Sequence, residues 1–377
     1  MTTIETAVGS GMKVVCARDE LVQRLGVVAR AVSTRLAVQV LSGVLLRAEA
    51  GELTLAATDM ELSLRASLAA EVEVEGSAVV PGRLLVEIGR HLPAGEVTID
   101  HAPEEGVVRI ACGGASYVLH TYSAEDFPRL PEAEEAERFP VDREVLLSTI
   151  ARVSRASSRD ESRPVLTGIL VRFESGKLVM AATDSYRLAV KESALEGVVP
   201  ELEAIIPARA LQELTRLAQA GETLELGLLE NQVVFGAGGT WLTTRRIDGQ
   251  FPNYRQLLPE TFEHEVTLPR EELLEVVRRT SVMAQRNSPL RLRFAEGELT
   301  VSAQTQDVGS SSESLPVPYA GETLEIGFNA EFLRDGIESV SSNELQLKLI
   351  SPLRPAVMQG GGADDFTYLI MPIRLAG

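Results

Sequence analysis

Leu-Ala-Ala-Thr-Asp, at residues 55–59, returns as Met-Ala-Ala-Thr-Asp at residues 180–184. A weaker third copy, Val-Ser-Ala-Gln-Thr, occupies residues 301–305. The copies are spaced by about 125 residues, which matches the common size of a domain. We therefore predict a chain built from three copies of one unit.

The order of elements within each copy supports this repeat. Each copy opens with a similar helical start, at residues 18–21, 143–146 and 270–273. A second helix is predicted to begin near Pro81, Pro207 and Asn329, and proline suits the fixed φ of a helix start. Short alternating runs that follow a glycine, such as Glu-Leu-Thr-Leu after Gly51, indicate antiparallel strands. The fold class is therefore α+β, with two helices packed on antiparallel sheets in each unit.

The length of 377 residues exceeds what a single core usually supports. We predict domains at residues 12–138, 139–260 and 261–377, after a disordered tail at residues 1–11. The borders fall in polar connectors such as the acidic run at residues 132–137.

Neither a membrane span nor a secretory signal is predicted, because no long apolar run exists and the N-terminus lacks a basic region. We expect a cytoplasmic protein. The two cysteines, Cys16 and Cys112, form no CxxC pair and are predicted to be small buried hydrophobic residues. The four histidines show no metal-ligand spacing, so neither a metal nor a cofactor is expected.

The arginines of the three opening helices stand out against a formal net charge of −18. Such a charge would ordinarily argue against a nucleic-acid partner, because DNA affinity comes largely from Lys and Arg. Yet residues 22–35, 145–159 and 273–286 hold nine arginines and one acid, Glu275. The nine are Arg24, Arg30, Arg35, Arg152, Arg155, Arg159, Arg278, Arg279 and Arg286.

In the middle copy, a rotation of 100° per residue separates an apolar stripe from a basic face. The stripe consists of Leu146, Ile150 and Val153. The basic face consists of Arg152, Arg155 and Arg159. A solvated helix face would explain any one helix. Because three repeats share the bias in an acidic protein, we favour a surface that faces phosphates.

Catalytic and phosphate-binding motifs are weak in this sequence. The glycine-rich run at residues 236–240 lacks the Lys-Ser/Thr ending of a P-loop, and Trp241 stands where a dinucleotide fingerprint needs glycine, so a hairpin turn is predicted. The repeated Thr-Asp could form a hydrolase dyad from Asp59 and Asp184, but aspartates at strand ends more often cap turns. A hydrolase and a scaffold that does not bind DNA remain the alternatives to a DNA-binding protein.

Four segments together resemble the bacterial DNA polymerase III beta subunit family over residues 12–375. They are Ala-Thr-Asp-Ser-Tyr-Arg-Leu-Ala-Val at residues 182–190, Asp-Gly-Gln-Phe-Pro-Asn-Tyr at 248–254, Ile-Gly-Phe-Asn at 326–329 and Tyr-Leu-Ile-Met-Pro-Ile-Arg-Leu at 368–375. The resemblance implies a head-to-tail homodimer, in which six domains form a ring with helices around the hole. Duplex DNA would pass through the hole without sequence-specific contacts, and no residue would be catalytic.

The resemblance also implies an apolar groove beside the C-terminal strand. It would take short linear peptides from the replicative DNA polymerase, the clamp loader and repair proteins. Arg187 and Arg374 would frame the polar ends of a ligand. Carried over by position, the groove residues are Leu166, Thr183, Ser185, Tyr186, Arg187, Leu188, Pro252, Leu257, Asn329, Phe332, Leu353, Leu369, Ile370, Met371, Pro372, Ile373, Arg374 and Leu375.

Two further sets of residues follow from the basic helices and the resemblance. The residues expected to face DNA are Arg24, Arg35, Arg152, Arg155, Arg159, Arg278 and Arg279. The seam that closes the ring would pair Tyr117 and Leu119 of one chain with Val282 and Met283 of the other.

Overall fold

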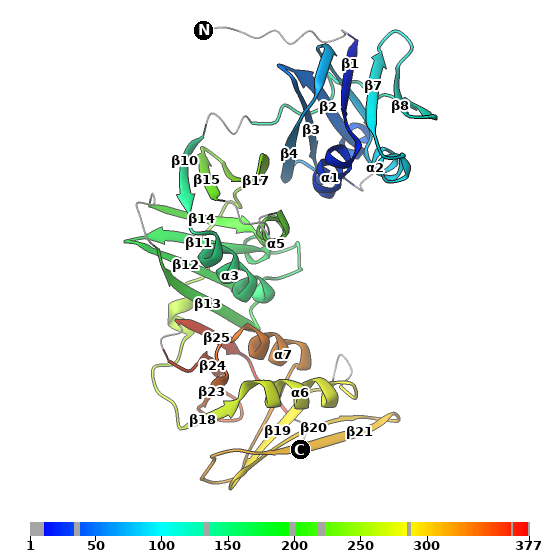
Figure 1. The fold of residues 1–377 in the computed structure, drawn as a ribbon. Coiled ribbons are helices and arrows are strands. Elements are labelled where there is room, and N and C mark those ends of the chain that lie inside the picture. The colour runs from blue at the N-terminus through cyan, green and yellow to red at the C-terminus, as the bar shows by residue number, and fades with distance from the viewer. Residues whose placement is uncertain are drawn as a thin grey trace. The chain divides into compact units, whose positions relative to one another are not determined.

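Two compact units make up the structure, a computed structural model in which each unit has its own sheets (Figure 1). The first comprises residues up to 141 with residues 216–245, and the second comprises residues 142–215 with residues from 246 onward. The structure describes residues 11–33, 38–131, 136–195, 201–217, 223–284, 288–362 and 365–375. Almost all of the predicted N-terminal tail and most of the acidic connector lie outside these residues.

The first unit holds the first repeat and part of the second. Its elements are β1 (Met12–Ala17), α1 (Arg18–Val28), η1 (Ala29–Ala31), η2 (Gln39–Ser42), β2 (Gly43–Glu49), β3 (Glu52–Thr58), β4 (Leu62–Ala69), β5 (Glu71–Val74), β6 (Gly76–Pro81), α2 (Gly82–His91), β7 (Glu96–Ala102), β8 (Val107–Cys112), β9 (Ala115–His120), β10 (Glu137–Val141), β15 (Leu224–Leu229), β16 (Gln232–Ala237) and β17 (Thr240–Arg245). They form a five-stranded sheet in the order β5-β1-β7-β8-β9 and an eight-stranded sheet in the order β10-β15-β16-β17-β4-β3-β2-β6.

The second unit holds the remainder of the second repeat and the third. Its elements are α3 (Arg143–Val153), η4 (Ser154–Ala156), α4 (Pro164–Thr167), β11 (Gly168–Glu174), β12 (Lys177–Thr183), β13 (Arg187–Ala194), β14 (Leu202–Pro207), most of α5 (Ala208–Leu217), η5 (Tyr254–Leu257), β18 (His264–Pro269), α6 (Arg270–Ser281), β19 (Leu290–Ala295), β20 (Glu298–Thr305), β21 (Gly309–Pro316), β22 (Leu324–Phe328), α7 (Ala330–Ser339), β23 (Glu344–Leu349), β24 (Ala356–Gly360) and β25 (Phe366–Ile370). They form an eight-stranded sheet in the order β14-β11-β12-β13-β25-β24-β23-β18 and a four-stranded sheet in the order β21-β20-β19-β22.

Successive repeats join edge to edge through these sheets. β4 of the first repeat pairs with β17 of the second, where Leu62 lies opposite Thr244. β13 of the second repeat pairs with β25 of the third, where Arg187 lies opposite Ile370. The second repeat is therefore divided between the two compact units, which the spacing of the repeats did not predict.

The opening helices form where the sequence predicts them. In α3, the Asp142 carboxylate caps the first turn by accepting a hydrogen bond of 2.9 Å from the Val145 backbone N–H. The stripe of Leu146, Ile150 and Val153 is buried, as predicted. Each opening helix packs on two strands of its own repeat: α1 on β3 and β4, α3 on β12 and β13, and α6 on β20 and β21.

The glycine-rich run forms a hairpin and not a phosphate loop. β16 and β17 pair up to Ala237 and Thr240, and Gly238 and Gly239 make the two-residue turn between them. Both glycines have positive φ, of 56° and 71°, which two-residue turns of this kind require. The predicted hairpin is confirmed.

Candidate functional site

The repeated Thr-Asp sequence forms a tight turn that leads into β13. Thr183 Oγ1 donates to the Arg187 carbonyl at 2.7 Å and accepts from the Ser185 N–H at 3.2 Å. Asp184 Oδ1 accepts from the Tyr186 and Arg187 N–H groups at 2.9 and 3.0 Å. Ser185 has a φ of 81°, so the turn presents Ser185 and Tyr186 outward at the end of β13.

The first repeat builds the same turn before β4. Thr58 Oγ1 donates to the Leu62 carbonyl at 3.1 Å, and Asp59 Oδ1 accepts from the Glu61 and Leu62 N–H groups at 3.1 and 2.9 Å. Met60 has a φ of 78°, matching its counterpart in the second repeat. Both aspartates are thus occupied in holding backbone amides. The Thr-Asp repeat is explained by a turn, and the hydrolase alternative loses the motif on which it rested.

The C-terminal strand continues past this turn and over β22. The Met371 N–H donates to the Tyr186 carbonyl at 2.8 Å, and the Ile373 N–H donates to the Gly327 carbonyl at 2.8 Å. Gly327 makes room for the last residues, because a Cβ built on it would lie 2.5 Å from Leu375 Cδ2. The structure thus brings the Thr-Asp turn and the C-terminal segment side by side.

Large apolar side chains are exposed around this junction. Tyr186 is 61% exposed and Met371 is 41% exposed, and apolar side chains exposed together on a surface often mark an interaction site. Ile373 is also exposed in the same C-terminal segment. Leu353 is 59% exposed in the loop before β24, and Leu257 is 52% exposed at the end of η5.

The segments that carry these exposed residues also contribute to a buried cluster. Leu188 and Leu369 face each other across β13 and β25, and both pack with Tyr254 of η5 in this cluster. Three more residues of the predicted groove are also buried, namely Leu166, Thr183 and Ile370. The rest of the set lies on loops or at element ends, with Pro252, Ser185 and Arg374 exposed and Asn329, Phe332, Pro372 and Leu375 partly buried. Asn329 has a structural role, because its Oδ1 caps α7 by accepting from the Phe332 N–H at 3.1 Å.

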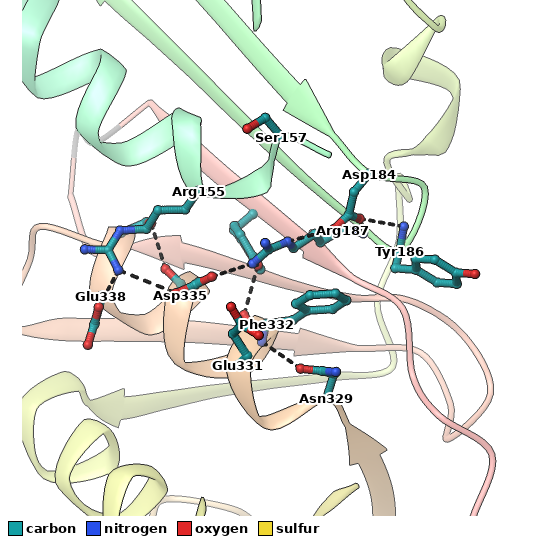
Figure 2. Close-up of polar contacts among 12 residues, drawn as sticks. Arg155, Ser157, Asp184, Tyr186, Arg187, Asn329, Glu331, Phe332, Asp335 and Glu338 are labelled. Atoms are coloured by element: carbon teal, nitrogen blue, oxygen red, sulfur yellow. Dashed lines mark hydrogen bonds and ion pairs between the residues drawn. The ribbon is translucent and has the colours of Figure 1, made fainter. Parts of the chain in front are cut away.

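The prediction that Arg187 frames the polar end of a ligand is wrong, because its guanidinium is buried and is held by Asp184 and Asp335 (Figure 2). Arg187 Nε donates to Asp184 at 3.0 Å, and one terminal nitrogen donates to Asp335 of α7 at 2.6 Å. The guanidinium also lies 4.1 Å from the centre of the Phe332 ring. Burial alone would lower the pKa of Arg187, but Tyr368, Asp335 and Asp184 raise it above its usual value, so the group stays charged. Arg187 therefore holds the turn of β13 to α7.

Most of the arginines predicted to face DNA are bound by the protein itself. Arg24 donates to the Gly238 carbonyl at 2.9 Å. Arg152 donates to the Ser339 carbonyl at 2.6 Å and stacks 4.2 Å over the Phe366 ring. These two partly buried side chains correct the prediction of a uniformly solvent-facing basic surface.

Three other arginines of this set sit in ion pairs. Arg155 contacts Asp335 at 3.5 Å and pairs with Glu338, as Figure 2 shows. Arg278 pairs with Glu338 at 3.0 Å and with Glu275 at 2.9 Å. Arg279 reaches the two carboxylate oxygens of Glu313 on β21 at 3.0 and 2.7 Å.

Arg159 differs from the others, with a side chain that is 94% exposed and lies 3.9 Å from Glu331. Two more of the nine arginines of the opening helices, Arg35 and Arg286, lie outside the described residues.

The predicted seam residues lie at two sheet edges. β9 ends its sheet in the described part of the chain, with Leu119 buried and Tyr117 partly buried on the same side of the strand. Val282 is 81% exposed after α6, and Met283 packs toward Gly309 at the start of β21. Leu119 already belongs to the core of its own chain, which the sequence did not predict.

Two exposed valines near these edges were not among the residues predicted from the sequence. Val118 projects from β9 and Val308 precedes β21, and both are among the exposed large hydrophobic residues. The alternation of β9 could have revealed Val118, because it lies on the opposite face from Tyr117 and Leu119.

Family models for the N-terminal, central and C-terminal domains of the DNA polymerase III beta subunit match residues 12–131, 140–253 and 255–374. The chain belongs to this family. A beta sliding clamp of Streptomyces coelicolor is 35% identical over 380 residues, covering 97% of this chain and 100% of the relative. A beta sliding clamp of Synechococcus elongatus is 36% identical over 375 residues, with the same coverage. A crystal structure of the DNA polymerase sliding clamp from Bacillus subtilis aligns with a TM-score of 0.92 at 26% identity, covering 97% of this chain and 100% of that one.

The family match confirms the predicted α+β architecture of three repeated domains. Both cysteines are buried, as predicted, and burial raises the pKa of the Cys16 thiol to about 12. Within the described residues, no helix is both long and apolar enough to cross a membrane, and no group of three or more His, Cys, Asp or Glu could hold a metal ion.

The sequence did not predict the role of Asp335 and Glu338 of α7, which hold arginines from other elements. Their spacing of three residues places both on one helix face, which is the available signal. Nothing in the sequence alone indicates that arginines from α3, β13 and α6 converge on that face.

Proposed function

We propose that the chain is a DNA sliding clamp, in which two copies close head to tail into a six-domain ring around duplex DNA. The ring tethers the replicative DNA polymerase and other replication and repair proteins, and it is a binding protein without catalysis. It works in the cytoplasm, where bacterial DNA is replicated. The three domains span residues 12–138, 139–260 and 261–377. The names of the relatives, beta sliding clamps, support this proposal.

The observation that carries the ring is the repeated pairing of sheet edges. β17 pairs with β4, and β25 pairs with β13 in the same antiparallel manner. One further joint of this kind can form, between β9 and β21. In the repeat, β9 is the counterpart of β17, and β21 is the counterpart of β4. Both end their sheets in the described part of the chain. Because the two strands are complementary, a second copy of the chain can complete the pattern at both ends.

The hairpins fix which residues correspond. In the first repeat Cys112 pairs with Ala115, as Ala237 pairs with Thr240 in the second. Ala115 on β9 therefore takes the place of Thr240 on β17. Counting from these positions, Val118 takes the place of Thr243.

The other side of the joint follows in the same way. Glu298 pairs with Pro316, as Glu52 pairs with Ala69. Ser310 on β21 therefore takes the place of Ser63 on β4, and Ser63 lies opposite Thr243. Across the seam, Val118 should lie opposite Ser310 of the partner subunit, and the exposed Val282 and Val308 should be covered there.

A pair of cysteines tests this register. In a chain carrying Val118→Cys and Ser310→Cys, opposite Cβ atoms about 5 Å apart should form a disulfide between subunits under mild oxidation. The control pair, Val118→Cys with Ser312→Cys, sits on a diagonal of about 7–8 Å and should cross-link poorly. Both native cysteines are buried and should not interfere. Equal cross-linking of the two pairs, or a monomer by light scattering, would contradict the seam.

The groove between the Thr-Asp turn and the C-terminal segment is proposed as the site for partner peptides. The exposed Tyr186, Leu257, Leu353, Met371 and Ile373 support this role, because the segments that carry them also contribute to one buried apolar cluster. A short peptide bearing Gln and Leu or Phe should bind there with modest affinity. Deleting the residues after position 370 should abolish binding while the dimer persists, and undiminished binding would remove the assignment.

A further inference from the structure

The carboxylates of α7 contact arginines of two of the segments that the sequence predicts to face DNA. Glu338 accepts from Arg155, which follows α3, through one oxygen, and from Arg278 of α6 through the other at 3.0 Å. Asp335, one turn earlier, lies 3.5 Å from Arg155 and is held on its other side by the buried Arg187. One short helix thus neutralises cations from both neighbouring helices, and Figure 2 shows its contacts with Arg155.

The Glu338 carboxylate is built to stay charged at this position. Its side chain is only 19% exposed, whereas those of Arg155 and Arg278 are 41% and 45% exposed. Burial would raise the pKa of Glu338, but the hydrogen bonds from Arg278 and Arg155 lower it below its ordinary value. The acid is therefore fixed within the protein while its two arginine partners reach the surface.

Further acids of the same unit extend this pattern. Glu275 contacts Arg278 at 2.9 Å and Arg279 at 3.4 Å, and Glu313 makes a two-pronged contact with Arg279. A guanidinium that already holds a carboxylate in this geometry must release it, or share it, before it contacts a phosphate.

We infer that Glu338 sets the strength of contact between the ring and DNA. It holds Arg155 and Arg278 in ion pairs, so a DNA phosphate can bind either arginine closely only by replacing the Glu338 carboxylate. This inference rests on the proposed passage of DNA through the ring. Exchange of one oxyanion for another keeps the net energy of each contact small, and weak contacts let a ring slide. Free guanidiniums would instead release counterions at each phosphate and bind more strongly.

Glu338→Gln tests the inference, with Glu331→Gln as its matched control. Both substitutions change an acid of α7 to its amide and raise the net charge equally. Glu331 is 52% exposed and lies 3.9 Å from Arg159, so it holds no arginine in a close pair in the described structure. Only the first substitution should remove a close carboxylate partner from both Arg155 and Arg278, which leaves Arg278 with Glu275 at 2.9 Å and Arg155 with Asp335 at 3.5 Å.

The measurements are duplex binding as a function of salt and diffusion of loaded rings along DNA. For Glu338→Gln, the slope of log Kobs against log[salt] should steepen by about 0.9 for each added phosphate contact. Diffusion of the loaded ring along DNA should slow because of the same added phosphate contacts. Adding Arg155→Ala and Arg278→Ala should remove both effects. Glu331→Gln should stay close to the unchanged protein.

Equal salt slopes and equal diffusion for Glu338→Gln and Glu331→Gln would overturn the inference. If Glu338→Gln does not fold, the more exposed Glu275→Gln frees part of the same pairing and should steepen the slope by a smaller amount; no change there would likewise refute it. A failure of the proposed function is separate, because it would leave the unchanged protein unable to remain on circular DNA.

Discussion

Replacing Arg187 with methionine should destabilise the second unit by about 3 kcal/mol. Methionine keeps an apolar stem against the Phe332 ring but removes the guanidinium that links Asp184 to Asp335. Both carboxylates have side chains only 12% exposed, so each would lose its partner in a site that water reaches poorly.

The magnitude follows from what each acid retains. Removing one partner of a buried ion pair costs about 3–5 kcal/mol, because the remaining charge is left uncompensated. Asp184 would keep two backbone N–H donors, and Asp335 would keep Arg155 at 3.5 Å. These contacts place the expected loss at the lower end of the range, about 3 kcal/mol.

Hydrogen exchange of the β13 and β25 amides measures this loss locally. Exchange through unfolding of this region should accelerate by about a hundredfold. Adding Asp335→Asn to Arg187→Met should recover part of the stability, because it removes one uncompensated charge. The fluorescence of Trp241, in the other compact unit, should stay unchanged and serves as a control.

A second control is Arg172→Met, which breaks the ion pair with Glu203, whose side chain is 60% exposed. Surface pairs of this kind contribute about 0–1 kcal/mol, so its effect should be small. If Arg187→Met cost no more than Arg172→Met, or if Asp335→Asn worsened the first variant, the reasoning about buried charge would be refuted.

Three further predictions concern single positions. Gly327→Ala should displace the C-terminal segment from its contact at Leu375 and weaken peptide binding in a titration, whereas Gly114→Ala, with open space around its Cβ, should bind peptide as before. Gly26→Ala, in the interior of α1 with no atom within 4 Å of the new Cβ, should raise stability by about 0.5–1 kcal/mol in urea unfolding; a loss would contradict the open site. The lowered pKa of Glu338 means that its stabilising contribution is present above the ordinary value of 4.5 and is lost as pH falls through the lowered pKa. Unfolding midpoints should therefore fall more steeply on acidification in the unchanged protein than in Glu338→Gln, and parallel curves would speak against it.

The sequence predicted the elements whose causes are local. The three helical starts, the buried stripe of α3 and the hairpin at residues 236–240 all depend on neighbours within a few positions of the chain. The repeat itself revealed the count of domains. The repeat did not predict how the domains join, because the edge pairing of β4 with β17 depends on strands far apart in sequence.

The position of the candidate site could be predicted from the sequence, but the burial and pairing of its charged side chains could not. Exposed Tyr186 and Met371 follow from the segments that resemble the family, yet the burial of Arg187 does not. Its environment is made by Asp335, which lies 148 positions away. The basic faces were misread for the same reason, since Glu338 and Glu313, which pair with these arginines, come from another helix and a strand.

Topological trapping tests the ring most directly. Rings carrying Val118→Cys and Ser310→Cys are loaded onto a nicked circular plasmid and oxidised, so that both seams become covalent. The plasmid should then carry the protein through denaturation in detergent, and cutting the circle once should release it. Loss of the protein from the intact circle after complete cross-linking of both seams, or equal retention on linear DNA, would contradict encirclement.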